Sequence, residues 1–505
     1  QVNAEVIAKL AAEQLRAENE YLALHEQFGA AAYDAHYQYA LSAKESADLD
    51  KTAKWSEDQL RYSLSAALVN RTDTQVKIEK DNIQAANITL EANRVGKVLA
   101  DDVLVDLGAG VANLTQAQLA ALGGAELDDI YVDDKTQPNK LRIVQRDDLN
   151  LTARGTIAVT AKHDVYLGGS KDFNIYNVQG DTVRIKTDGN IESARGNNVV
   201  VTGADVVLEA SAGSIGGNGS LHVDVSGGLT ARAGKAIALT QAGNLNIQSL
   251  TAGAGVNLNV GGNLMGLGLV GEHIKAGGDI LLRIAGNLGS AAQRIQLNSQ
   301  TDRIDLDVDR NAYIGGRQGT AQSGNLNIRT ASVDGLLDIA QTDTLTQSGD
   351  WSLGALLMDL GANWSMGSGT SVTAQTSLDA TLGNNANLGA LSVTGTTGNL
   401  SLKAKTLQSN ADGVLWKADT VSLTSTGTAT SSGDIGALSR YLRVQGKDVN
   451  VSASGKLFLE LAAGVTSGKL ISQGGLSLKS MGDLSLAKVQ SKTAAVQLRG
   501  LGVLK

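Results

Sequence analysis

Along most of the chain, apolar and polar residues alternate in short runs that follow a glycine and an Asn or Asp. Strict alternation predicts half-buried β-strands, and a Gly-Asn or Gly-Asp pair before a strand predicts a turn. The phrase recurs at Gly189-Asn190-Ile191, Gly243-Asn244-Leu245, Gly262-Asn263-Leu264, Gly278-Asp279-Ile280, Gly286-Asn287-Leu288, Gly324-Asn325-Leu326, Gly398-Asn399-Leu400 and Gly482-Asp483-Leu484.

The spacing of these phrases predicts how the strands stack. The interval from Gly286 to Gly324 is about twice as long as the interval from Gly243 to Gly262, and the interval from Gly324 to Gly398 is about four times as long. Other intervals do not divide cleanly, so we expect coil length to vary and some turns to carry insertions. A turn and a short strand repeated roughly every 19 residues is typical of a solenoid, and leaves no room for a helix in each repeat. We therefore predict an all-β solenoid, a right-handed parallel β-helix of about 19 coils and on the order of 90 Å.

The alternation also predicts which side chains face the core. The apolar residues of three phrases should point inward, while Ser, Thr, Asn, Lys and Glu point outward; the inward set is Leu245, Ile247, Leu326, Ile328, Leu400 and Leu402. Aromatic residues make up only 3% of the chain, so the core should consist of thin layers of Val, Ile, Leu and Ala. The single proline, Pro138, fits stacked strands that donate backbone amides on both sides.

Residues 1–72 carry a different pattern and are predicted to be a helical hairpin or a coiled-coil module. Good helix formers fill this region, and Ser56 with Gln59 resembles a capping box that opens a second helix. Apolar and aromatic residues recur at heptad spacing in two companion rows. These rows are Ile7, Gln14, Tyr21 and Phe28, with Leu10, Ala17, Leu24 and Ala31.

Residues 73–140 are predicted to be a transition before the β-helix rod of residues 141–505. Val76-Lys77-Ile78 and Ile88-Thr89-Leu90 alternate as strands do, and Leu114–Leu122 is predicted to be a short helix that ends at Gly123-Gly124. Acidic residues at 128, 129, 133 and 134 and Pro138 follow in a predicted loop. We interpret this region as an insertion that interrupts the solenoid.

Composition and charge exclude several classes of function. The chain has no cysteine, so it contains neither disulfides nor thiolate metal sites. A net charge of −8 argues against nucleic acid as a partner, because phosphate binding requires a basic face. No apolar stretch reaches the length of a membrane span. The chain begins at Gln1 without a signal-like segment, so we expect a piece of a larger protein or a processed product.

One acidic run has the spacing of a calcium loop. Asp305, Asp307, Asp309 and Asn311 follow the EF-hand pattern, but Arg310 occupies the position of the required Gly and no Glu follows at the twelfth place. Apolar residues interleave with the aspartates, so we predict a strand with a solvated acidic face.

Other candidate sites are weaker, and we predict no catalytic, cofactor-binding or metal-binding residues. The stretch Gly216–Leu221 is similar to a calcium-binding nonapeptide repeat, but it lacks the Asp and does not recur. The histidines lack the i, i+4 pairing of a zinc helix. They are His25, His36, His163, His222 and His273. No Ser-His-Asp set can be singled out, and short turns leave little material for a roofed catalytic cleft.

The Gly-Asn-Leu repeats, the polar outward positions and the absence of Cys resemble the filamentous haemagglutinin family, giant adhesins of Gram-negative bacteria exported by two-partner secretion. The resemblance covers roughly residues 140–505. The family's secretion domain carries an Asn-Pro signature that this chain lacks, so the resemblance implies an internal rod segment of such an adhesin. It also implies a right-handed β-helix at the cell surface or in the biofilm matrix.

Two classes of function follow. The favoured one is a non-enzymatic structural and adhesive rod that presents or contributes to binding of carbohydrate or neighbouring cells, with an outer-membrane secretion partner for the parent protein. The alternative is a carbohydrate-active β-helix similar to a tailspike polysaccharide depolymerase, in which N-terminal helices would trimerise.

Overall fold

The computed structural model of the chain describes residues 82–98, 103–106, 130–132, 140–143, 146–267, 273–299, 301, 303–315, 325–427, 433–462 and 465–503. These residues belong to two compact units, one made mainly of the chain up to Thr187 and the other mainly of the chain from Asp188 onward. The predicted helical module of residues 1–72 and the predicted helix at 114–122 lie outside the described residues. No described residue is helical, and the strands wind as a parallel β-solenoid, with about 16 turns in the two units together.

The first unit contains coils whose strands pair in parallel with strands of later coils. Ile83 pairs with Leu151, and Ile88 pairs with Ile157, so one coil already precedes residue 140. The coil strands of this unit are β1 (Ile83–Ala85), β2 (Ile88–Ala92), β8 (Leu149–Ala153), β9 (Thr156–Ala161), β10 (Val165–Gly168) and β12 (Thr182–Thr187). Solenoid pairing therefore begins at Ile83 and resumes at Leu149.

Between these two coils the chain makes short antiparallel pairings instead. Strand β3 (Lys97–Val98) pairs with β7 (Arg146–Asp147), and β6 (Lys140–Ile143) pairs with both β4 (Val103–Asp106) and β5 (Ile130–Val132). These antiparallel pairs stand between the parallel pairing of the coil at residues 83–92 and that of the coil that begins at Leu149. The strand predicted at Ile88-Thr89-Leu90 is confirmed as part of β2.

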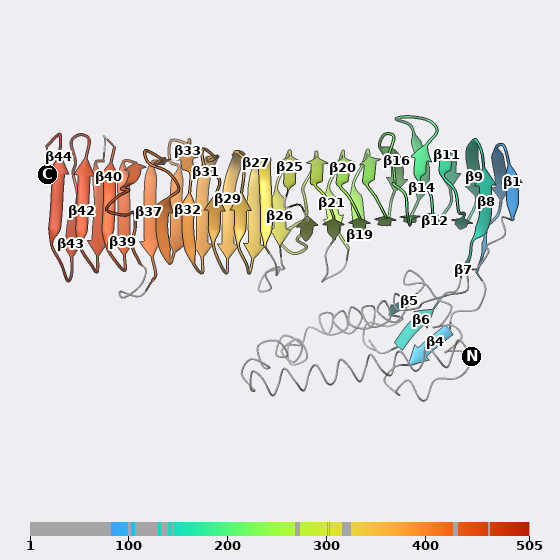
Figure 1. The fold of residues 1–505 in the computed structure, drawn as a ribbon, viewed down its shortest axis with the longest axis horizontal. Coiled ribbons are helices and arrows are strands. Elements are labelled where there is room, and N and C mark those ends of the chain that lie inside the picture. The colour runs from blue at the N-terminus through green and yellow to red at the C-terminus, as the bar shows by residue number, and fades with distance from the viewer. Residues whose placement is uncertain are drawn as a thin grey trace. The chain divides into compact units, whose positions relative to one another are not determined.

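The second unit is a longer stack of parallel strands, which lie side by side in successive turns (Figure 1). Strand β11 (Phe173–Gln179) is divided between the two units. The next strands are β13 (Ile191–Ser193), β14 (Val199–Gly203), β15 (Asp205–Ala210), β16 (Leu221–Val225), β17 (Gly228–Ala233), β18 (Ile237–Gln241), β19 (Leu245–Ala252), β20 (Val256–Val260), β21 (Leu264–Gly266), β22 (Ile274–Ala276), β23 (Ile280–Ile284), β24 (Leu297–Ser299), β25 (Ile304–Val308) and β26 (Ala312–Gly315).

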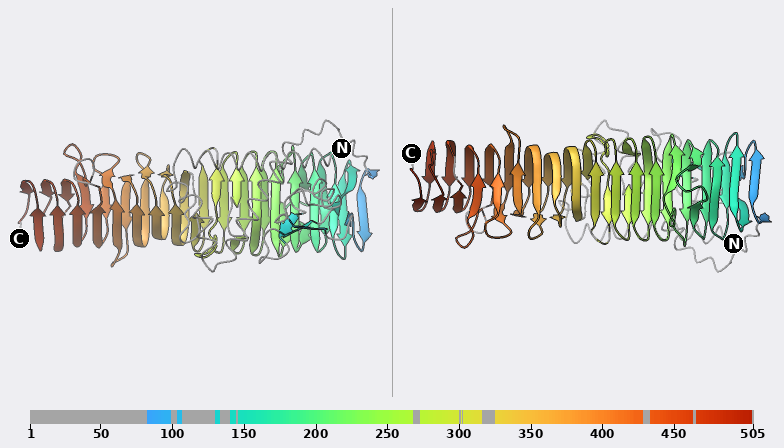
Figure 2. Two further views of the ribbon diagram at one scale, coloured as in Figure 1. Left: turned by 90° about the horizontal axis from the view of Figure 1, so that it is seen from below. Right: turned by 90° about the horizontal axis from the view of Figure 1, so that it is seen from above.

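Three long strands follow in the stack, which Figure 2 shows from below and from above. The first of them pairs with both β25 and β26, so it spans more than one face of the coil. They are β27 (Leu326–Gln341), β29 (Trp351–Leu360) and β31 (Ser371–Leu382). The remaining strands are β28 (Leu345–Gln347), β30 (Trp364–Met366), β32 (Asn385–Leu388), β33 (Ala390–Val393), β34 (Asn399–Ala404), β35 (Thr406–Ser409), β36 (Leu415–Lys417), β37 (Thr420–Ser425), β38 (Leu442–Gln445), β39 (Asp448–Ala453), β40 (Leu457–Leu461), β41 (Ser467–Ser472), β42 (Leu476–Ser480), β43 (Lys488–Ser491) and β44 (Val496–Gly500).

The register of these strands shows that coil length is less regular than the repeats predict. Ile237 stacks on Val256, and Val256 stacks on Ile280, so the second of these two coils is longer than the first. The interval from Gly286 to Gly324 does not represent two coils. Leu288 stacks on Ala312, and Ala312 stacks on Leu337, so Leu337 and not Leu326 lies two coils after Leu288. Leu326 belongs to another column and stacks on Leu345. Similar Gly-Asn phrases therefore open strands on different faces of the coil. Longer coils also explain why there are about 16 turns instead of the larger number predicted.

The core follows the predicted alternation. All six residues assigned to it are at most 2% exposed: Leu245, Ile247, Leu326, Ile328, Leu400 and Leu402. The core is not purely aliphatic, however, because Trp351, Trp364 and Trp416 are buried in it. The rings of Trp351 on β29 and Trp364 on β30 stack with their centroids 6.3 Å apart.

The Asn of the repeated phrase forms a ladder between coils. The backbone N–H and the Nδ2 of Asn263 donate to Oδ1 of Asn244 at 2.8 and 3.2 Å, and Asn287 makes the same two bonds to Asn263. The N–H of Asn311 donates to Asn287 at 3.1 Å, and the N–H of Leu336 donates to Asn311 at 2.8 Å. Each Asn side chain thus satisfies a backbone donor in the turn of the next coil, where no strand partner is available.

The glycine of the phrase makes room for this ladder. A Cβ atom on Gly262 would lie 2.5 Å from Oδ1 of Asn244, and one on Gly286 would lie 2.5 Å from Oδ1 of Asn263. A side chain at either position would displace the amide that caps the turn. The Gly and the Asn of the pair therefore act together. The Asn side chain accepts a hydrogen bond from the next coil, and the absence of a side chain on the Gly leaves space for the Asn of the previous coil.

We expect Asn263→Ala to weaken the coil junction at residue 287. The substitution removes the acceptor of the Asn287 N–H, at a cost of about 1 kcal/mol, and each coil contacts only its neighbours, so the effect should be local. Hydrogen exchange should show faster exchange of the Asn287 amide. Asn257→Ala, on the exposed face of β20, is the matched control. Equal exchange at Asn287 in both variants would show that the ladder contributes nothing.

Candidate functional site

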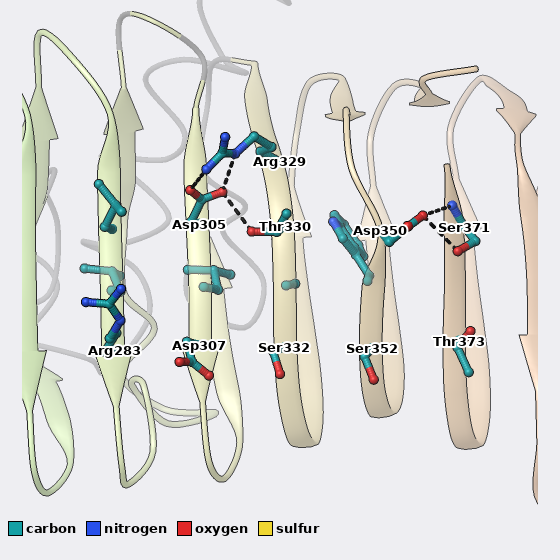
Figure 3. A pocket seen from close by; sticks show the side chains of 15 residues that line it. Arg283, Asp305, Asp307, Arg329, Thr330, Ser332, Asp350, Ser352, Ser371 and Thr373 are labelled. Atoms are coloured by element: carbon teal, nitrogen blue, oxygen red, sulfur yellow. Dashed lines mark hydrogen bonds and ion pairs between the residues drawn. The ribbon is translucent and has the colours of Figure 1, made fainter. Parts of the chain in front are cut away.

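A groove of about 780 Å³ lies on one face of the second unit, across β23, β25, β27, β29 and β31. Parallel register places two rows of outward side chains along its floor (Figure 3). The Asp305 row consists of Leu281, Asp305, Thr330, Asp350 and Ser371, and the Asp307 row consists of Arg283, Asp307, Ser332, Ser352 and Thr373. Neighbouring members of a row are about one strand spacing apart, roughly 4.8 Å.

The sequence builds this face through the period of two along each strand. In β25, Ile304, Leu306 and Val308 are buried, so Asp305 and Asp307 emerge on the opposite side. A bulge between Asp305 and its predecessor in the pairing with β27 brings Asp305 opposite Thr330. The prediction of a strand with an acidic outer face is confirmed.

The polar groups of the Asp305 row bond to one another. Asp305 accepts hydrogen bonds from Nε of Arg329 at 2.8 Å and from the hydroxyl of Thr330 at 2.8 Å, and a second guanidinium nitrogen also contacts it. Asp350 accepts from the N–H and the hydroxyl of Ser371 at 2.8 and 2.9 Å. This row therefore has a fixed arrangement before any ligand arrives.

The Asp307 row is different, because its polar groups remain available. Among the described residues, none of its five side chains forms a hydrogen bond or ion pair, and four of them are exposed: Arg283, Asp307, Ser332 and Ser352. The row offers a guanidinium donor, a carboxylate acceptor and three hydroxyls at regular intervals. Such a surface can bind a polar polymer that runs across the strands.

The Arg329 guanidinium lowers the pKa of the Asp305 carboxyl below its ordinary value of 3.8. Its side-chain hydrogen bond is the main cause, partial burial opposes it, and the Thr330 hydroxyl adds to it. Asp305 is therefore ionised at neutral pH and is poorly suited to donate a proton, as the acid of a glycoside hydrolase must. Its place in the groove is that of a fixed hydrogen-bond acceptor.

The other candidates from the sequence are dispersed. Asn311 belongs to the asparagine ladder, and in the turn at Gly216–Leu221 the Glu192 carboxylate accepts the N–H groups of Gly217 and Asn218 at 3.1 and 3.0 Å. These contacts give both motifs a role in connecting coils. Within the described residues, no group of three or more His, Asp or Glu is placed to hold a metal ion.

The three histidines that the structure describes are not among the residues that line the groove. His163 contacts Asp181 at 3.3 Å, His222 lies on β16, and Nδ1 of the buried His273 accepts the Gln296 N–H at 3.1 Å. His25 and His36 are outside the described residues. The groove itself cannot be predicted from the sequence, because nothing marks Thr330, Asp350 and Ser371 as neighbours of Asp305 until the coil lengths are known.

The chain matches no protein-family model, no curated protein and no solved structure. Within the described part of the chain, there is no helix with the length and apolar character needed to cross a membrane.

We expect Arg329→Gln to raise the pKa of Asp305, because the substitution removes the charged donor while partial burial persists. In the native protein the lowered pKa stabilises this face above the ordinary value of 3.8, and the stabilisation is lost as pH falls through the lowered folded-state value. A carboxyl-selective NMR titration measures the change. Arg283→Gln, one coil away, is the control, and an unchanged Asp305 titration in Arg329→Gln would contradict the assignment.

Proposed function

We propose that this chain is a non-enzymatic structural and adhesive rod segment of a surface or biofilm-matrix adhesin of a Gram-negative bacterium, and that the groove binds carbohydrate. The unoccupied hydrogen-bonding capacity of the Asp307 row carries the proposal. The exported, extracellular setting, the secretion partner in the outer membrane, the right-handed winding and the N-terminal α-helical segment belong to the same proposal. The setting, the secretion partner and the winding follow from the resemblance to filamentous haemagglutinins, whereas the helical segment follows from the heptad pattern of residues 1–72.

Stacking supports the role of a rod. Each described coil bonds to the next through parallel backbone ladders and, in several turns, through Asn side chains, and the chain has no cysteine that could form a disulfide. A stack of this kind displays polar side chains at the same height on consecutive coils, as the Asp307 row does. That regularity suits a polymer with a repeating pattern of hydroxyls.

The charges of the groove favour a neutral glycan. Arg283 and Arg329 oppose Asp305, Asp307 and Asp350, which leaves a net charge of −1 on the lining. A polyanion would gain little from this surface and would be repelled by the exposed Asp307. Hydroxyl groups of a neutral sugar can donate to Asp307 and accept from Arg283 and the serines.

Asp307→Asn tests the groove. We expect it to weaken binding of the full chain to a neutral oligosaccharide identified on a glycan array by about tenfold, since a hydrogen bond to a charged group contributes about 1.5–3 kcal/mol. Asp359→Asn, on another exposed part of β29, is the matched control and should bind as the native protein does. Equal affinity of both variants would exclude the Asp307 row as the binding surface.

The same preparation also tests the tailspike-like alternative, in which Asp307, the carboxylate of β25 without an ion pair among the described residues, would be the catalytic group. The neutral polysaccharide is incubated with the full chain, and the release of reducing ends is measured. No release is expected. Release that disappears in Asp307→Asn would replace the adhesive rod with a polysaccharide depolymerase.

A further inference from the structure

The last coils of the second unit carry a positive charge that contrasts with the acidic chain as a whole. Between residues 435 and 503 there are nine Lys or Arg against three Asp or Glu, a net charge of +6, whereas the whole chain has a net charge of −8. This stretch comprises β38–β44 and their turns. These positive charges lie outside the core and outside the Asp307 row, so neither feature explains the excess.

Strand register brings these positive groups together. Lys469 of β41 pairs with Lys488 of β43, and Lys479 of β42 pairs with Arg499 of β44. Like charges directly opposite each other on neighbouring strands repel and destabilise a sheet. The two pairs connect the same two coils and place repelling charges on two of their faces. Lys492 lies in the connection between β43 and β44. We call these five residues the basic corner.

The acidic residues nearby are occupied by other groups. Glu460 forms an ion pair with Arg443 at 3.2 Å, and Asp483 accepts the Val503 N–H at 2.8 Å. Asp448 accepts hydrogen bonds from Ser467 at 3.1 Å and Asn450 at 3.2 Å. None of them forms an ion pair with the basic corner.

Most of the basic corner is therefore free to meet an anion. Among the described residues, Lys469, Lys488, Lys492 and Arg499 form no ion pair, and all four are exposed. Lys479 lies 3.8 Å above the centroid of the Tyr441 ring, which holds its ammonium near the surface without neutralising it. The arrangement is a row of cations along the stack that continues around a corner.

We propose that the basic corner binds a linear acidic polysaccharide. Acidic groups spaced along a polymer can contact successive lysines, which are roughly 4.8 Å apart between strands, and a flexible chain can follow both faces. A flat anionic bilayer cannot contact both faces at once. The proposal goes beyond carbohydrate binding at the groove, because it concerns a different surface and a ligand of opposite charge preference.

The test uses the full chain and three immobilised polymers: alginate, which is carboxylated, dextran sulfate, which is sulfated, and neutral dextran. Binding to the acidic polymers should decrease with added salt. The double variant Lys469→Gln, Lys488→Gln should bind alginate about tenfold more weakly, equivalent to about 1.4 kcal/mol. Its affinity for dextran should not change. Dextran sulfate shows whether the acidic group can be sulfate as well as carboxylate.

Lys403→Gln, Lys417→Gln is the matched control, because both lysines are exposed on earlier coils and form no ion pair among the described residues. It should bind alginate as the native chain does, and so should Asp307→Asn, which separates this surface from the groove. Circular dichroism verifies that each variant is folded. Equal alginate binding by the two double variants would overturn the proposal. Tighter binding to duplex DNA or to anionic vesicles than to alginate at the same salt would overturn the choice of ligand.

Discussion

Parallel backbone pairing between coils is the constraint on which this structure depends. Once a strand bonds in register to the strand of the next coil, every inward and every outward position is repeated at the same height. The core columns, the asparagine ladder, the groove and the basic corner are all consequences of that repetition. A residue in this fold acts as a member of a row, and its effect depends on which residues occupy the row before and after it.

Turns are where the repetition is hardest to maintain, because backbone N–H groups there lack a strand partner. The Asn ladder solves this with one side chain per coil, from Asn244 to Asn311. The chain can lengthen between the capped turns without disturbing the strands, as the unequal steps from Ile237 to Val256 and from Val256 to Ile280 show. Irregular length and regular register are therefore compatible in this molecule.

The period of two and the Gly-Asn phrase were sufficient to predict strands, their buried faces and the solenoid, because each is a local property of the sequence. The assignment of phrases to coils was not local. Leu288 and Leu326 follow the same phrase, yet they stack in different columns, since the coils between them are longer than the repeat suggests. For the same reason the sequence placed Asp305 and Asp307 on an outer face but could not bring Thr330 and Asp350 beside them. The buried tryptophans were not predicted, because the aromatic residues of this chain are too few to form a periodic pattern.

The stacked pair Trp351 and Trp364 gives the molecule an internal optical reporter. Trp351 follows Asp350 directly and precedes Ser352, so its backbone lies in the floor of the groove while its ring lies in the core. Two indole rings with centroids 6.3 Å apart and planes inclined by 23° are close enough for their electronic transitions to couple. Near-ultraviolet circular dichroism of this pair can therefore report on the packing of the core beneath the groove without an added label.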